Sequence, residues 1–371
     1  MKTDLIVAIP TVGISSNKLN CLLPQLKNFT KIDVSYVVSD DATPIPEEVE
    51  RKRQICEKNN VRFIQNPDGD LNRNLNYIFN NTTEKWVLIF EDGMFPSKEW
   101  LEPVIDVINN FEDLELNSFR GKQKIGSIQL RHTEFQKAVC AGIVKTSIDW
   151  KDWLLHWDTG IGIYYEALKE LYGTDFSWYT GEDTWYKLSC GMAKWAKENI
   201  SYINTFKKSP NGFPYFSEGD IYKDIFISEN GIPEYEKEVW VGYNFGSLAA
   251  VRREMWDKTG GYCPGYNFFE GYMGVKAYEN NYICINLPTS PLYHLRSQGH
   301  MSVVLDHKDR ELDRRAKLYD GVSFDEKTVK LFGKTMDKVG IDISSGITPE
   351  IVSQVQAITN YLKPYVDRWY K

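Results

Sequence analysis

Short apolar runs alternate with amphipathic segments along the first third of the chain. Apolar runs bounded by turn residues predict buried strands, and apolar residues at helical spacing predict helices between them. In chain order, the pattern predicts strands at 5–11, 34–38, 61–64, 86–90 and 125–130, and helices at 19–29, 47–58, 71–80 and 97–111. Strands that alternate with helices form a parallel sheet with right-handed crossovers. We therefore expect an α/β fold.

Acidic residues follow two of the predicted strands at the point where each ends. The run WVLIF stops at Glu91 and Asp92, and the second predicted strand leads to Asp40 and Asp41. In an open α/β sheet, ligands bind outside the carboxyl ends of the strands. Adjacent carboxylates repel unless a cation or a shared proton separates them, and divalent ions on substrate phosphates use one or two carboxylates in this way. The pattern favours a nucleotide site, although a solvated acidic turn has the same local sequence.

The composition restricts the class of protein. With 371 residues, 42% of them hydrophobic and 26% charged, the chain is typical of globular proteins with one large or two ordinary domains. The formal net charge of −7 disfavours nucleic acid as a partner. The apolar run near the amino terminus is too short for a signal-peptide core, and no segment is expected to span a membrane. Six cysteines without zinc spacing indicate reduced thiols, so we expect a cytoplasmic protein.

An ordered set of motifs in the first third resembles a known family. The set runs from IPT to VSDDAT, then to Gly69, Arg73, Asn74 and Leu75, and ends with VLIFEDG. No glycine-rich dinucleotide fingerprint and no P-loop signature is present in the sequence. Over roughly residues 4–108, this order resembles the GT-A glycosyltransferases, above all the large inverting family 2. The resemblance implies a Rossmann-like, mostly parallel central sheet and a nucleoside-diphosphate sugar, linked to UDP or GDP, as donor.

The resemblance also assigns residues to the nucleotide. The loop after the first strand and the acid after the second hold the base and ribose in that family. Those positions correspond here to Pro10, Thr11 and Asp40, with Asp41 beside it, and Arg73 matches an arginine that approaches the nucleotide. Each of these residues also fits an ordinary turn, helix cap or solvated helix face, so the prediction depends on their occurring together.

The acidic motif departs from the family pattern at its last position. The family has a metal-binding aspartate there, and this chain has Gly93. A divalent ion, Mn²⁺ or Mg²⁺, would therefore depend on Asp92 or Glu91. His294 resembles a late histidine of the family that binds metal or diphosphate, although a histidine near a strand end is also a common structural hydrogen-bonding residue.

Two places in the chain offer a general base for the acceptor hydroxyl, a role that suits a carboxylate. The first is Asp183 in the Gly-Glu-Asp motif at 181–183. The second is Glu270, followed by Gly271 where the family pattern has an aspartate. Glu270 belongs to the longer pattern formed by Arg252, Arg253, Gly260, Gly261, Glu270, Pro288 and His294. Asp183 and Glu270 remain equal candidates.

The resemblance divides the chain into four parts. We expect a nucleotide-sugar-binding half at 1–130, an aromatic-rich insertion or acceptor region at 131–240, an acceptor and catalytic half at 241–296, and a helical C-terminal extension at 297–371. The tryptophans of the insertion form either a small aromatic core or part of an acceptor groove. In the extension, Thr348 and Pro349 predict the start of a helix.

The sequence thus predicts an inverting glycosyltransferase that moves a sugar to a carbohydrate, lipid or protein acceptor. Gly93 and Gly271 also fit a catalytically weakened relative that only binds glycans or nucleotides. A nucleotidyltransferase is disfavoured because the loop VGISSNK has few glycines, and a sugar transferase acting on modified nucleobases in DNA is disfavoured by the net charge. A homo-oligomer is left open.

Overall fold

Ten strands form one sheet in the computed structural model of the protein. The structure describes residues 4–13, 15–96, 98–118, 121–133, 237–242, 248–264, 269–294 and 349–369. The strands are β1 (Leu5–Thr11), β2 (Ser35–Asp41), β3 (Arg62–Asn66), β4 (Trp86–Ile89), β5 (Met94–Pro96), β6 (Glu115–Ser118), β7 (Gly121–Thr133), β8 (Trp240–Gly242), β9 (Ala249–Arg252) and β10 (Tyr282–His294). The described helices are α1 (Ser16–Asn28), α2 (Pro46–Lys58), α3 (Leu71–Asn80), α4 (Glu102–Phe111), α10 (Arg253–Thr259), α11 (Phe269–Glu279) and α15 (Pro349–Trp369).

The sheet is mixed but mostly parallel. Its strand order is β3-β2-β1-β4-β9-β7-β10-β5, with β6 paired to β7 and β8 paired to β10. The first four strands are parallel, as the sequence predicts. β9 is antiparallel to both of its neighbours, β4 and β7, so β7 and β10 point the same way as β1 to β4. The strands on both sides of residues 134–236 therefore belong to a single sheet.

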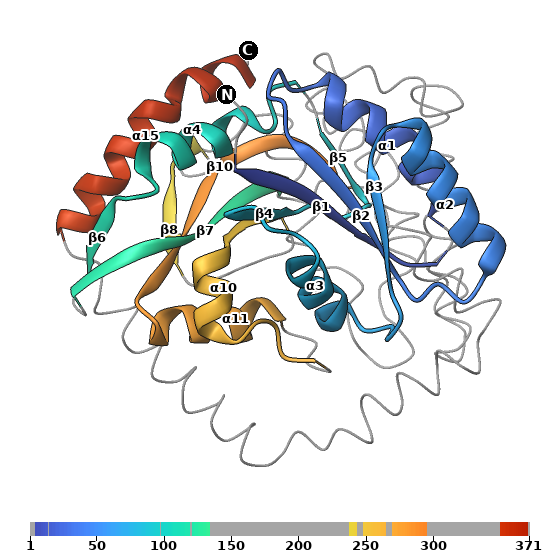
Figure 1. Ribbon diagram of the computed structural model, residues 1–371. Coiled ribbons are helices and arrows are strands. Elements are labelled where there is room, and N and C mark those ends of the chain that lie inside the picture. The colour runs from blue at the N-terminus through green and yellow to red at the C-terminus, as the bar shows by residue number, and fades with distance from the viewer. Residues whose placement is uncertain are drawn as a thin grey trace, which may run out of the picture.

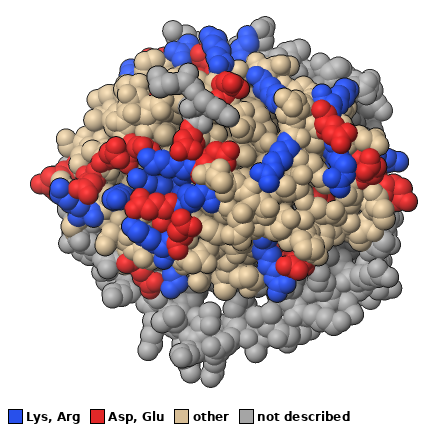
Figure 2. All heavy atoms as spheres, viewed as in Figure 1, with Lys and Arg blue, Asp and Glu red and all other residues tan. Residues whose placement is uncertain are grey.

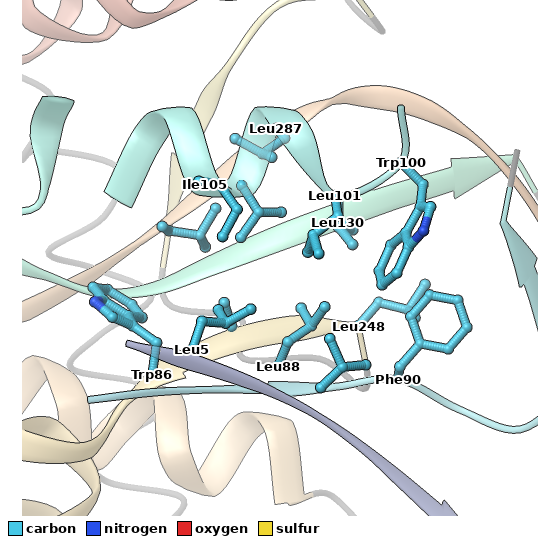
Figure 3. Packing of buried hydrophobic residues seen from close by; sticks show 14 of the residues in the cluster. Leu5, Trp86, Leu88, Phe90, Trp100, Leu101, Ile105, Leu130, Leu248 and Leu287 are labelled. Atoms are coloured by element: carbon cyan, nitrogen blue, oxygen red, sulfur yellow. The ribbon is translucent and has the colours of Figure 1, made fainter. Parts of the chain in front are cut away.

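Helices cover both faces of the sheet, which explains the continuous apolar runs of the strands. In β1, Leu5, Val7 and Ile9 face one hydrophobic cluster, and Ile6 and Ala8 face the other. The first cluster lies under α1, α2, α4 and α15, and the second lies under α3, α10 and α11 (Figure 1). Figure 3 shows the packing of the first cluster around the start of α4. Two layers of helices thus cover the faces of the sheet, and the loops at its carboxyl edge lie outside these layers.

Several predicted boundaries differ from the structure by three or more residues, among them the end of β2 and the start of α4. β2 continues to Asp41 instead of stopping at residue 38, because Asp40 and Asp41 pair in register with Gln65 and Asn66 of β3. The helix predicted from residue 97 begins at Glu102. Glu99 has a left-handed φ of 60°, and the fully buried Trp100 ring packs edge-on against Phe90, so this stretch forms a turn.

The C-terminal part of the chain completes the core. α15 starts at Pro349, as predicted, and packs against α4, β6 and β10. The described cysteines Cys56, Cys263 and Cys284 are free thiols, and burial raises the pKa of Cys56 and of Cys284 to about 12. Among the described helices, none combines the length and the apolar character needed to cross a bilayer.

Candidate functional site

The ends of β1, β2 and β4 meet at the carboxyl edge of the sheet. Thr11, the last residue of β1, lies in register beside Asp40 of β2. After β4 the chain turns through Glu91 and Asp92, and the Met94 amide donates to the Glu91 carbonyl to close the turn. The predicted nucleotide residues of three strands are therefore brought together at one edge. The binding of a nucleotide by these residues stays a prediction.

Asp92 is bound through both of its carboxylate oxygens. The Thr11 hydroxyl donates to Asp92 Oδ2 at 2.8 Å, and Lys18 Nζ donates to Asp92 Oδ1 at 2.9 Å. The Lys18 and Asp92 side chains are only 12% and 14% exposed. Thr11 Oγ1 also lies 2.5 Å from Ser15 Oγ, and since its own proton goes to Asp92, Ser15 is the donor in that bond. We refer to Thr11, Ser15, Lys18 and Asp92 as the acidic-turn cluster.

Asp40 is enclosed in a network of its own. Its carboxylate accepts hydrogen bonds from the Thr43 amide at 3.0 Å, the Thr43 hydroxyl at 2.6 Å and Lys52 Nζ at 2.7 Å. The Asp40 and Lys52 side chains have no exposed surface. The Gly13 amide also donates to the Thr43 hydroxyl, so the network ties the loop after β1 to the loop after β2. In this structure Asp40 shapes those loops, and direct contact of its side chain with a nucleotide remains a prediction.

The other two predicted nucleotide residues, Asp41 and Arg73, have different surroundings. Asp41 is 7% exposed and accepts a hydrogen bond from Asn66 Nδ2 at 2.8 Å. Arg73 is exposed in the first turn of α3, where its backbone amide donates to the helix-capping carboxylate of Asp70. Asn74 Nδ2 donates to the Ser39 carbonyl, which holds α3 against β2. Arg73 is thus presented to solvent at the carboxyl edge by a fixed helix.

The amino terminus of α1 is already neutralised by a carboxylate. Glu48 Oε1, from the first turn of α2, accepts hydrogen bonds from the Ser15 and Ser16 amides at 2.9 and 2.7 Å. The Ser16 hydroxyl donates to Glu48 Oε2 at 3.1 Å. A free helix amino terminus can bind a phosphate group. Here Glu48, which is 2% exposed, occupies that position.

The structure describes only some of the residues predicted for the acceptor half. Asp183 lies outside the described residues. Glu270 is in the first turn of α11, which packs along β10 and leads into the start of that strand, so its amino-terminal turn lies toward the carboxyl edge. His294 ends β10 and pairs in register with Met94, two residues beyond Asp92. The side chains of Glu270 and His294 are not among the described parts, so these placements concern the backbone.

The described residues do not fit a divalent cation. No group of three or more His, Cys, Asp or Glu side chains capable of holding a metal occurs in the described ranges. Gly93 provides no side-chain ligand, and the Asp92 carboxylate is already paired with the Lys18 ammonium group. A dication bound to Asp92 would have to displace or repel Lys18.

Sequence reasoning missed Lys18, Glu48 and Lys52. Glu48 and Lys52 belong to a stretch whose charge pattern indicates a solvated helix, yet both are buried. Lys18 lies only seven positions after the end of β1, but its partner Asp92 is 74 positions away, so the sequence gives no direct signal for the contact. Two asparagines of α3 were not predicted either. Asn72 and Asn76, one helical turn apart, donate to the carbonyls of Cys263 and Tyr262.

These features define an open α/β protein whose site lies where parallel strands end in acids. Residues 7–172 match the family model described as Glycosyl transferase family 2, and no curated protein matches. Over these residues, which make up less than half of the chain, the sequence is similar to glycosyltransferases of family 2, and the fold is an open α/β sheet covered by helices on both faces.

Several solved structures are similar at low identity. S. aureus TarS 1-349 is 13% identical with a TM-score of 0.40, over 79% of this chain and 60% of that one. Mannosyltransferase PcManGT from Pyrobaculum calidifontis, in complex with GDP-Man and Mn²⁺, is 12% identical with a TM-score of 0.39, over 100% of this chain and 84% of that one. Glucosyl-3-phosphoglycerate synthase from Mycobacterium tuberculosis is 9% identical with a TM-score of 0.38, over 81% of this chain and 75% of that one. The chain covers less than two thirds of the TarS structure.

Proposed function

We propose that the protein transfers a sugar from a nucleoside-diphosphate donor, linked to UDP or GDP, to an acceptor hydroxyl with inversion at the anomeric carbon. One observation carries the proposal. Asp92 and Thr11, at the ends of two neighbouring parallel strands, are joined by a 2.8 Å hydrogen bond within the segment that matches family 2. Open α/β sheets bind ligands at this edge.

Most of the predicted residues have a place in this scheme. Pro10, Thr11 and Asp41 line the base and ribose side, with Asp40 holding the loops, and Arg73 reaches the diphosphate from α3. In the reaction the acceptor oxygen bonds to the anomeric carbon, the bond from that carbon to the diphosphate oxygen breaks, and a carboxylate takes the acceptor proton. We propose Glu270 or Asp183 for that carboxylate. The position of the first turn of α11 supports Glu270.

The acceptor is proposed to be a carbohydrate, a lipid or a protein. On the face seen in Figure 2, the described Lys and Arg side chains are interleaved with Asp and Glu. Ion pairs such as Lys122–Glu115 and Lys124–Glu254 join opposite charges. On this face, interleaved charge gives little net attraction to a phosphate backbone, and the formal net charge of −7 of the chain likewise disfavours DNA as the acceptor.

Titration of the full-length chain with UDP and GDP in a calorimeter tests the proposal. The variant Asp92→Ala is expected to lose at least about tenfold in affinity, which corresponds to about 1.4 kcal/mol. Asp113→Ala is the matched control, because Asp113 is an exposed aspartate after α4, away from the carboxyl edge. Unchanged affinity for both nucleotides in Asp92→Ala would contradict the proposal.

A catalytically weakened binding protein is the second candidate, and Gly93 is the observation that favours it. Such a protein would bind UDP or GDP but would neither transfer nor hydrolyse a donor sugar. Assaying UDP- and GDP-linked sugars for hydrolysis, with and without Mn²⁺, separates the two candidates. Release of free sugar by the wild type, lost in Asp92→Ala, would favour the transferase.

A further inference from the structure

We propose that Lys18 is the built-in cation of this site: its ammonium group balances Asp92 and binds the donor diphosphate in the place where a divalent metal would otherwise act. The proposal deepens the proposed function and depends on it for the identity of the anion. It begins from the 2.9 Å contact between Lys18 Nζ and Asp92 Oδ1. Lys18 is the third residue of α1 and reaches the turn after β4 from there.

The acidic-turn cluster fixes the ammonium group in position. Thr11 donates to one oxygen of Asp92, and Ser15 donates to Thr11, so the carboxylate is oriented by a chain of hydroxyl groups. Thr11 and Ser15 are 4% and 1% exposed. An oriented carboxylate holds Lys18 in a defined place. Asp92 is therefore a positioning residue, and Lys18 is the group that meets the ligand.

The ammonium group retains the capacity to bind an anion. An ammonium carries three N–H donors, and Asp92 accepts from one of them. The Lys18–Asp92 pair is mostly buried, but 12% of the Lys18 side chain is exposed. The ammonium group is therefore partly shielded from water and still accessible to a ligand. Reduced contact with water strengthens its attraction for phosphate oxygens.

Among the described residues, two other positive groups close to this edge are already engaged. Lys52 is buried against Asp40, and the amides that open α1 are bound to Glu48. A diphosphate at the end of β4 would thus meet Lys18 first, with the exposed Arg73 approaching from α3.

The same geometry opposes a divalent ion at Asp92. A cation that bound both oxygens of this carboxylate would displace the Thr11 hydroxyl and bring Lys18 beside a like charge. Gly93 offers no second carboxylate to offset that repulsion. Lysine and glycine therefore form a consistent pair: one supplies the charge, and the other leaves out a ligand that a metal would need.

Nucleotide titrations in EDTA and in MnCl₂ test the proposal on the full-length chain. Wild type is expected to bind UDP or GDP in EDTA within about threefold of its affinity in Mn²⁺. Lys18→Met should lose at least about tenfold in EDTA, and Lys18→Arg should retain most of the binding because it keeps the charge. Lys31→Met, at an exposed lysine before β2, is the matched control and should bind as wild type does. Equal melting temperatures of the Lys18 variants and wild type exclude a folding defect.

A second measurement uses Mn²⁺ alone and does not depend on the nucleotide. Wild type is expected to bind Mn²⁺ no more tightly than Asp92→Ala, as followed by calorimetry or electron paramagnetic resonance. Mn²⁺ binding that disappears in Asp92→Ala would overturn the proposal, as would nucleotide binding by the wild type only in Mn²⁺ or full binding by Lys18→Met in EDTA. If the wild type binds neither nucleotide in either buffer, the proposed donor is wrong, and the Mn²⁺ measurement alone then decides the role of Lys18.

Discussion

Asp40 and Lys52 form an ion pair whose two side chains are completely enclosed. A buried charge is tolerated only while its partner and hydrogen bonds remain, and loss of one member leaves the other uncompensated. Thr43 completes the network by donating to Asp40 and accepting from Lys52 and from the Gly13 amide. At the scale of single residues, the loops that would surround a nucleotide are therefore held by a charge pair beneath them.

Lys52→Met is expected to lower the free energy of unfolding by about 3–5 kcal/mol, because it leaves Asp40 charged and buried. The double variant Asp40→Asn with Lys52→Met should lose less than the single one. Lys58→Met provides the control, since Lys58 is exposed on the same helix, and its effect should stay within about 0.5 kcal/mol. Urea unfolding measures all three variants. Equal stability of the two single lysine variants would show that the pair does not contribute as argued.

At the scale of elements, α3 links the two halves of the sheet. Asn74 binds Ser39 at the end of β2, and Asn76 accepts from the Tyr262 amide and donates to the Tyr262 carbonyl. The segment after α10 approaches α3 closely at Gly261, where an added Cβ would lie 2.6 Å from Asn76 Oδ1. This close contact holds the beginning of the segment between α10 and α11 against α3.

Gly260→Ala and Gly261→Ala form a matched pair, since both glycines have a φ of 79°. Each substitution places a side chain in the left-handed region, at a cost of about 1–2 kcal/mol. Gly260 has no atom near an added Cβ, whereas Gly261 would also clash with Asn76 and Trp256. Gly261→Ala is therefore expected to destabilise by about 1–3 kcal/mol more than Gly260→Ala. Equal shifts in urea midpoints would contradict the close contact.

The elements could be predicted from sequence where the pattern is local. The helix at 71–80 and the start of the strand at 86 agree with the structure, because apolar spacing alone specifies them. The end of β2 could not be predicted in this way, since Asp40 and Asp41 stay in the strand through distant partners, Lys52 and Asn66. For the same reason the site was predicted as a set of acids at one edge, but its cation Lys18 was not.

At the scale of the whole molecule, α15 closes one face of the sheet. Ile351, Val355, Ile358 and Leu362 are buried at helical spacing against the first hydrophobic cluster. Figure 1 shows α15 beside α4, and the Tyr365 hydroxyl donates to Asp106 Oδ2 of α4 at 2.6 Å. Burial, with the neighbouring Asp106 carboxylate, raises the pKa of Tyr365. The helix α15 is thus part of the core, on a helical face of the sheet.

Ile358→Ala is expected to cost about 2–5 kcal/mol of unfolding free energy, because Ile358 has no exposed surface and its removal leaves a cavity. Val352→Ala on the same helix is the control. Val352 is 55% exposed, so its truncation should change stability by no more than about 0.5 kcal/mol. Thermal and urea unfolding both measure the difference. A loss below 1 kcal/mol in Ile358→Ala would mean that α15 contributes little to the core.

The position of β9 has a consequence for synthesis on the ribosome. β9 lies between β4 and β7 in the sheet, although it begins at Ala249 and β7 ends at Thr133. At about 5–20 residues per second, the ribosome needs on the order of ten seconds to translate the intervening stretch. Until then, the facing edges of β4 and β7 lack their native partner, and exposed strand edges attract other chains. The nascent protein thus passes through a stage in which its N-terminal half is built but its sheet is open, and a chaperone that shields strand edges would act there.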